Sequence, residues 1–301
     1  MTAVIANGLK LEVETMGNPA DPAVLLIMGL GMQLVAWPEP FCRALVDAGF
    51  HVIRFDNRDV GLSDKITARK PANLPLAAMR YFLRLPVRAP YLIDAMAADS
   101  IGVLDALGIK AAHFVGVSLG GMIAQTAAAN YPKRCLSLTS IMASSGDRRL
   151  PNAKLKVTRL MLSRPPARAS VEQLTDHLVR LFEAIGSPGF PTPPALLRER
   201  LSGGLRRGYH PQGTLQQLLA IVASGDRSAQ LRTIAKPTLI LHGDSDPLVR
   251  VDHGIDCARK IPRAQLKIVP GMGHDLAPGL LPILSDALVG HFRASGAAPS
   301  G

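Results

Sequence analysis

The sequence is poor in aromatic residues and in long apolar runs. Aromatic side chains make up 4% of the 301 residues, so the pattern of a single-strand nucleic-acid binder is missing despite a net charge of +11. No run approaches the roughly 18 consecutive apolar residues of a membrane span, and no secretory signal is visible at the N-terminus. These absences predict a soluble, cytoplasmic protein with no nucleic-acid partner and no membrane span.

Cysteine is also scarce, with three residues at wide spacing: Cys42, Cys135 and Cys257. An odd number so far apart argues against a disulfide framework, and no two of them form the CxxC pair of a metal site. We therefore expect small buried or half-buried thiols and no metal.

Positive charge is concentrated in one part of the chain. Residues 147–232 contain fourteen Lys and Arg against six Asp and Glu, which accounts for most of the net charge. Because these charges are scattered among Leu, Ala and Pro, a solvated basic face is the favoured interpretation, and attraction to an acidic substrate or an anionic surface is the alternative. The overall composition, 48% hydrophobic and 19% charged, is that of a folded globular chain.

Apolar runs alternate with helical patterns over much of the chain. Residues 4–16 alternate around Asn7-Gly8 as a β-hairpin does. The continuous apolar run at residues 23–28 suits a strand buried on both faces, and further strand patterns follow at residues 51–56, 112–117, 135–142, 237–243 and 265–270. Helical patterns separate them at residues 37–49, 93–107, 120–129, 251–260 and 279–294, before a tail, 295–301, that we expect to be frayed. This alternation indicates a mostly parallel sheet.

The alternation stops between residues 147 and 232. Helical patterns lie at residues 155–162 and 171–185, and no strand pattern is present. Prolines and glycines interrupt the remainder: Pro188, Pro191, Pro193, Pro194, Gly203, Gly204 and Gly208. We predict a mostly helical cap over residues 147–232, inserted into a core formed by residues 1–146 and 233–301. The basic, Pro-interrupted residues 65–89 have no assignable role.

A Gly-x-Ser-x-Gly pattern stands where an apolar run becomes a helix-prone segment, at Gly116-Val117-Ser118-Leu119-Gly120. Small neighbours allow a sharp strand-to-helix turn that pushes the serine hydroxyl out of the fold, as a nucleophile elbow requires. Gly and Ser are also common in ordinary turns, so this motif alone does not establish a nucleophile, and motifs elsewhere in the chain must support it.

Two later strands end in turns that hold residues of catalytic type. Asp246 lies in the turn at residues 243–249, and His274 lies in the turn after the next strand. Functional groups gather at the carboxyl ends of parallel strands, so Ser118, Asp246 and His274 can meet in one crevice. A histidine can take the serine proton, and a carboxylate can hold the histidine in the right tautomer.

Acyl transfer also needs donors for a developing oxyanion. The backbone amide of Leu119, at the start of the helix after the serine, is one candidate. The amide of Leu30, in the turn between Gly29 and Gly31, is the other. Taken alone, this turn would be interpreted as an ordinary tight turn. Together with Ser118, Asp246 and His274 in the same chain, it is interpreted as part of an oxyanion hole.

In this order, the motifs resemble the α/β-hydrolase fold superfamily over nearly the whole chain. They occupy residues 27–31, 56–63, 116–121, 242–247 and 273–274. Trp37-Pro38 and the stretch from Tyr209-x-Pro211-x-Gly213 to Arg227 are similar to the aclacinomycin methylesterase-like branch. The resemblance implies an α/β-hydrolase fold with about eight strands in a mostly parallel sheet, helices on both faces, and a helical cap after the sixth strand. Met28-Gly29 departs from the His-Gly of many members.

The resemblance implies that Ser118 is the nucleophile, His274 the general base and acid, and Asp246 the orienting carboxylate. Asp244 is the rival of Asp246, but the family pattern puts the acid directly before a Pro-hydrophobic pair, so Asp244 is expected to cap the turn. Asp275 is expected to face solvent. The other histidines lack a matching motif and are expected to be structural or exposed: His51, His113, His177, His210, His242, His253 and His291.

The leading hypothesis is a cofactor-free serine hydrolase that cleaves small-molecule carboxylic esters through an acyl-enzyme. A serine at the elbow argues against the dehalogenase and epoxide-hydrolase branches, which use a carboxylate there. The same triad could instead serve acyl transfer, lactone, C–C or perhydrolysis chemistry, and a non-catalytic binding protein with this fold is the alternative from another class. The sequence defines neither the particular ester nor the oligomeric state.

Overall fold

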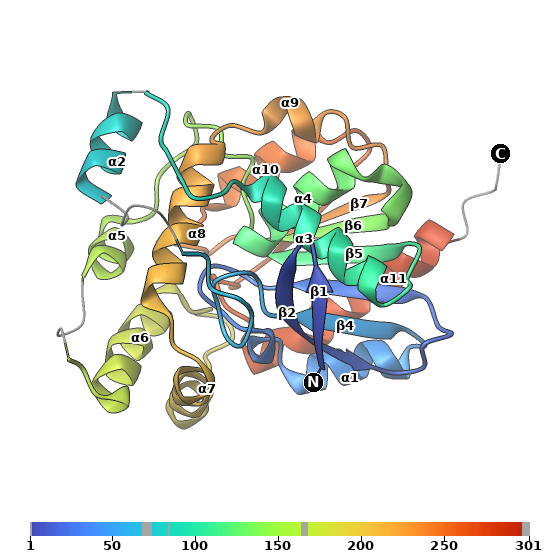
Figure 1. Cartoon of the computed structure of the whole chain (residues 1–301), viewed down its shortest axis with the longest axis horizontal. Helices are drawn as coiled ribbons and strands as arrows, with labels where there is room; N and C mark the ends of the chain where they lie inside the picture. Colours follow the sequence, from blue (N-terminus) through green and yellow to red (C-terminus); the bar gives the residue numbers. More distant parts are fainter. Residues whose placement is uncertain (1, 68–73, 84, 164–167, 297–301) are drawn as a thin grey trace.

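A single eight-stranded sheet forms the centre of the computed structural model, which describes residues 2–67, 74–83, 85–163 and 168–296 (Figure 1). The strand order is β1-β2-β4-β3-β5-β6-β7-β8. The strands are β1 (Thr2–Ala6), β2 (Leu9–Met16), β3 (Ala23–Ile27), β4 (His51–Phe55), β5 (Ala112–Val117), β6 (Cys135–Ile141), β7 (Thr238–Gly243) and β8 (Gln265–Val269). All neighbours from β4 across to β8 are parallel, whereas β1 and β2 pair antiparallel. The predicted hairpin and the mostly parallel sheet are confirmed.

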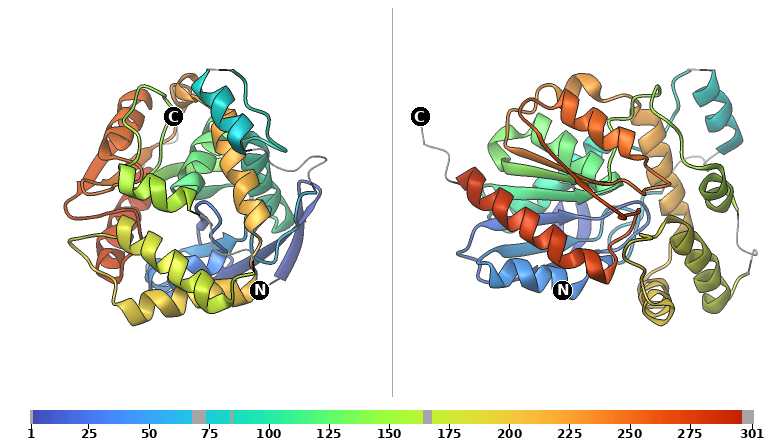
Figure 2. Two further views of the ribbon diagram at one scale, coloured as in Figure 1. Left: turned by 90° about the vertical axis from the view of Figure 1, so that its left-hand side faces the viewer. Right: turned by 180° about the vertical axis from the view of Figure 1, so that it is seen from behind.

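Helices cover both faces of the sheet, as predicted (Figure 2). One face carries α1 (Glu39–Asp47) and α11 (Leu281–Gly296), and the other carries α3 (Ile93–Ala106), α4 (Leu119–Asn130) and α10 (Val251–Lys260). Successive side chains of a strand point to opposite faces, so Val24 and Leu26 of β3 join one core and Leu25 and Ile27 the other. This double burial explains why the strand is a continuous apolar run.

Between β6 and β7 the described chain forms helices and no strand, which confirms the predicted insertion after the sixth strand. These helices are α5 (Leu155–Leu162), α6 (Val171–Ile185), α7 (Pro194–Arg207), α8 (Pro211–Ser224) and α9 (Ser228–Leu231). Pro194 and Pro211 begin helices, because the first turn of a helix does not need the missing N–H. The division into a cap, 147–232, and a core, 1–146 and 233–301, stays a prediction.

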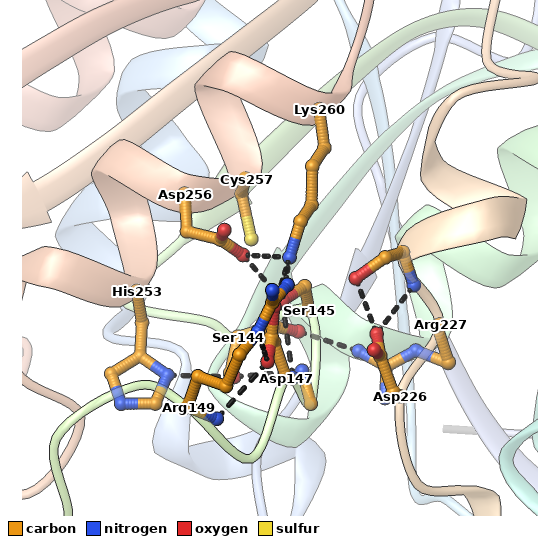
Figure 3. Close-up of polar contacts among 12 residues, drawn as sticks. Ser144, Ser145, Asp147, Arg149, Asp226, Arg227, His253, Asp256, Cys257 and Lys260 are labelled. Atoms are coloured by element: carbon orange, nitrogen blue, oxygen red, sulfur yellow. Dashed lines mark hydrogen bonds and ion pairs between the residues drawn. The ribbon is translucent and has the colours of Figure 1, made fainter.

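A polar cluster ties the two ends of this inserted segment to α10 (Figure 3). The Nζ atom of Lys260 donates to Asp147 over 2.9 Å and to Asp256 over 2.7 Å. The buried Arg227 donates its backbone N–H to the Ser145 carbonyl over 2.8 Å, and burial lowers the pKa of its guanidinium to about 10. The start and the end of the segment are therefore fixed side by side, which anchors the helices between them.

The remaining short helices are α2 (Leu74–Phe82), within the unassigned residues 65–89, and the 3-10 turns η1 (Leu34–Ala36), η2 (Pro132–Arg134) and η3 (Pro278–Leu280). The frayed tail was predicted to start at residue 295, which is too early in the chain. Ser295 still lies in α11, and its hydroxyl donates to the His291 carbonyl over 2.7 Å. Residues 297–301 lie outside the described residues.

All three cysteines are buried and free, as predicted. Within the described part of the chain, no helix is both long and apolar enough to cross a bilayer. The cytoplasmic location stays a prediction.

Candidate active site

Ser118 lies at a strained turn between β5 and α4. Its backbone has a φ of 54° and a ψ of −120°, a conformation that a residue with a side chain rarely adopts. The two flanking glycines allow the turn. A Cβ atom on Gly116 would lie 2.0 Å from the Gly120 carbonyl oxygen, and one on Gly120 would lie 2.0 Å from that of Ile27. Larger residues at positions 116 and 120 would therefore push α4 away from β5 and β3.

The side chains of Ser118, His274 and Asp246 form one hydrogen-bonded chain, although they come from three separate strand ends. The Nδ1 atom of His274 lies 2.6 Å from Oδ2 of Asp246, and its Nε2 atom lies 3.0 Å from the Ser118 Oγ. Because an ionised carboxylate only accepts, Nδ1 carries the proton and Nε2 is left to accept from the serine hydroxyl. This arrangement can remove the proton from Ser118.

Asp246 and Asp244 play different structural parts. Asp246 is 3% exposed, and its second oxygen accepts from the backbone amides of Leu248 and Val249, each over 2.9 Å. Asp244 is exposed and accepts from the Gly271 amide over 2.8 Å, so it links the turns after β7 and β8. The geometry joins only Asp246 to the histidine.

Asp275 does not face solvent, contrary to our expectation. Its carboxylate accepts a short hydrogen bond from the Ser187 hydroxyl, and burial raises the pKa of the carboxyl. The same Ser187 oxygen accepts from the Gly273 amide over 2.8 Å, and the His274 amide donates to the Ile185 carbonyl over 2.7 Å. The end of α6 and the residues after it thus hold the turn that carries the histidine.

His242 is buried next to Asp246, with 3.6 Å between its Nε2 and the carboxylate oxygen. Its Nε2 donates to the Val249 carbonyl over 2.6 Å, and its Nδ1 has no hydrogen-bond partner among the described residues. Burial lowers the pKa of this imidazole, which keeps the ring neutral. His242 is therefore a structural histidine, as expected. Nowhere in the described ranges do three His, Cys, Asp or Glu side chains lie where they could hold a metal ion.

The glycine turn after β3 lies against Ser118, since a Cβ on Gly29 would be 3.3 Å from that of the serine. Among the described residues, no hydrogen-bond acceptor meets the Leu30 amide. The amide of Leu119 is in the first turn of α4, where N–H groups have no acceptor within the helix. Both amides are therefore available to a ligand oxygen.

Gln217 of α8 holds this turn, and sequence reasoning missed it. Its Oε1 accepts from the Gly31 amide over 2.9 Å, and its Nε2 donates to the Arg58 carbonyl over 2.8 Å. The side chain is fully buried. Gly31 has a φ of +67°, and a Cβ there would lie 2.7 Å from the Thr214 hydroxyl, so α8 packs closely on the turn. A lone glutamine in a helical pattern gives no sign of such a contact.

Two relatives match almost the full length of the chain. The rhodomycin D methylesterase of Streptomyces peucetius is 28% identical over 98% of this chain and 99% of its own. The rhodomycin D methylesterase of Streptomyces sp. (strain C5) is 30% identical over 95% of this chain and 96% of its own. These relatives confirm the predicted resemblance to a methylesterase branch and the prediction of an esterase-type hydrolase.

Solved structures give the same fold. The meta-cleavage product hydrolase of Pseudomonas fluorescens IP01 has a TM-score of 0.76 at 21% identity, and the match covers 98% of both chains. The family model described as the alpha/beta hydrolase fold matches residues 22–277. The chain therefore belongs to the alpha/beta hydrolase fold family.

Proposed function

We propose that the protein hydrolyses carboxylic esters of small molecules, with Ser118 as the nucleophile, His274 as the general base and acid, and Asp246 as the carboxylate that orients the histidine. The observation that carries this proposal is the hydrogen-bonded chain from Asp246 through His274 to Ser118, with distances of 2.6 and 3.0 Å. Methyl esters are the proposed substrate class, because both rhodomycin D methylesterases match nearly the whole chain.

In the proposed reaction, the Ser118 oxygen attacks the ester carbonyl while His274 Nε2 takes its proton. The amides of Leu30 and Leu119 stabilise the tetrahedral oxyanion. Collapse of this intermediate breaks the bond to the alcohol oxygen, and the histidine gives its proton to the leaving alcohol. A water, deprotonated by the same histidine, then attacks the acyl carbon. The bond to the Ser118 oxygen breaks as this second intermediate collapses, and His274 returns its proton to the serine as the acid leaves. Asp246 stabilises the imidazolium formed in each half-reaction.

The helical residues 147–232 act in this proposal as a cap over the core. Two contacts support that role. Gln217 reaches the glycine turn beside Ser118, and Ile185 accepts from the amide of His274. The cap would thus hold both sides of the site as well as cover it.

The proposed hydrolysis is tested with a panel of methyl esters in ¹⁸O-labelled water. We expect turnover without added metal or cofactor, with one ¹⁸O atom in the acid product and none in the methanol, because water attacks the acyl carbon. Transfer of the acyl group to an added alcohol in preference to water would replace hydrolysis with acyl transfer. Lack of turnover, together with no labelling of Ser118 by a fluorophosphonate, would overturn the proposal in favour of a binding protein.

Gln217→Leu is expected to lower kcat, because the variant releases the Gly31 amide and lets the Leu30 amide move away from the oxyanion position. A misplacement of this kind costs up to about 10²-fold, and we expect most of the loss in kcat and little in KM. Steady-state kinetics on a methyl ester measures both quantities.

Gln216→Leu is the matched control, since this neighbour is also buried in α8 but donates to the Ile66 carbonyl over 3.0 Å. Gln217→Glu keeps an acceptor for Gly31 and should recover part of kcat. Equal losses in the Gln216 and Gln217 variants would show that α8 packing, and not the glycine turn, determines the rate.

A further inference from the structure

Two segments far apart in the sequence carry basic residues and no acidic ones. Residues 65–93 contain six Lys and Arg, residues 148–171 contain seven, and neither segment contains any of the 23 Asp and Glu of the chain. Ordinary solvated surfaces intersperse both signs of charge. This separation of charge therefore favours an anionic partner over a solvated basic face as its explanation.

The structure places described parts of the two segments near each other. Helix α2 comes from the first and α5 from the second, and both lie at the same outer end of the molecule (Figures 1 and 2). Arg148, directly before the loop to α5, donates to the Tyr81 carbonyl of α2 over 3.3 Å. Its guanidinium also lies 4.5 Å from the centre of the Tyr81 ring. Arg148 thus fixes α2 beside the start of the second segment, which carries the exposed cations Arg148, Lys154, Lys156 and Arg159.

This surface also exposes aliphatic side chains. On α5, Leu155 and Leu162 are 64% and 71% exposed, whereas Val157 on the opposite side of the helix is buried. Residues seven apart share a helix face, so both leucines point outward beside Arg159. Leu76 and Met79 of α2, with Leu83 directly after it, repeat the pattern with exposures of 45%, 51% and 61%. We call these five side chains and the exposed Arg148, Lys154, Lys156 and Arg159 the α2–α5 surface.

A partner of this surface must contact both its cationic side chains and its exposed aliphatic side chains. A nucleic acid or an acidic protein segment would neutralise the cations, but single-stranded binding uses stacked aromatic rings, and the Tyr81 ring is covered by Arg148. A bilayer with anionic headgroups takes up aliphatic side chains below the headgroups and pairs Lys and Arg with them. Helices with outward leucines flanked by cations fit this environment.

We infer that the α2–α5 surface docks the protein onto anionic lipid surfaces. The inference concerns binding and does not depend on the proposed ester hydrolysis.

Sedimentation of the full chain with vesicles tests the inference. We expect binding to phosphatidylcholine vesicles that contain phosphatidylglycerol, and at least about tenfold weaker binding to pure phosphatidylcholine or at high salt, where charges are screened. Leu155→Gln combined with Leu162→Gln should weaken binding by about tenfold with the charge unchanged. Lys156→Gln combined with Arg159→Gln should weaken binding by a similar factor and reduce its salt dependence.

The matched controls alter exposed residues elsewhere: Ile5→Gln with Leu266→Gln for the leucines, and Lys110→Gln with Lys133→Gln for the cations. These controls should bind as the unmodified protein does, and all variants should keep the same thermal midpoint and the same hydrolysis of a water-soluble ester. Equal binding to neutral and anionic vesicles, or no binding to either, would overturn the inference. Full binding by the leucine variant, or capture of polyuridylate in place of vesicles, would also overturn it.

Discussion

Ser118→Ala is expected to lower kcat on a methyl ester by about 10⁶-fold, the scale seen when the nucleophile of a serine hydrolase is removed. The variant loses the only atom that forms the acyl-enzyme in the proposed mechanism. The fold should be kept, because alanine needs no more space and the turn is shaped by Gly116 and Gly120. Initial rates together with thermal unfolding measure the two effects separately.

Ser245→Ala is the control for this loss. Ser245 lies next to Asp246, but its hydroxyl donates to Asp244 over 2.8 Å and to no member of the hydrogen-bonded chain. A fluorophosphonate should label the unmodified protein and the Ser245 variant, and it should not label Ser118→Ala. Undiminished turnover by Ser118→Ala would remove Ser118 from the mechanism.

Asp246→Asn is expected to lower kcat by about 10⁴-fold, the effect of the same change in other Ser-His-Asp enzymes. The carboxylate accepts the His274 Nδ1 proton over 2.6 Å. An amide NH₂ at that position would favour the tautomer with the proton on Nε2, which cannot accept the serine proton. The loss should therefore fall on kcat, with KM little changed.

The neighbouring Asp244 provides a direct comparison. Asp244→Asn keeps an oxygen that can accept from the Gly271 amide, so kcat should change by less than about tenfold, as expected for a surface substitution. If Asp244→Asn caused the larger loss, the orienting role would belong to Asp244 and the proposed mechanism would need that correction.

Much of the fold follows from local patterns. Double burial makes β3 a continuous apolar run and makes β5 and β7 mostly apolar. The 3.6-residue period of amphipathic helices predicted α5 and α6 with the bounds they have. Prolines and glycines were harder to interpret. Pro194 is predicted to interrupt structure, yet it begins α7, and Gly203 and Gly204 lie inside that helix. A proline by itself does not distinguish a break from the first turn of a helix.

The sequence by itself determined the residues of the candidate site, because a Gly-x-Ser-x-Gly turn and two strand-end motifs restrict where Ser118, Asp246 and His274 can lie. Only the tertiary structure showed how they are held. Gln217 reaches Gly31 from a helix 186 residues away, and Asp275 turns inward to Ser187. It also placed α2 beside Arg148, near the exposed cations and leucines of α5. Such contacts depend on how distant helices pack, and packing partners leave no local period or motif in the chain.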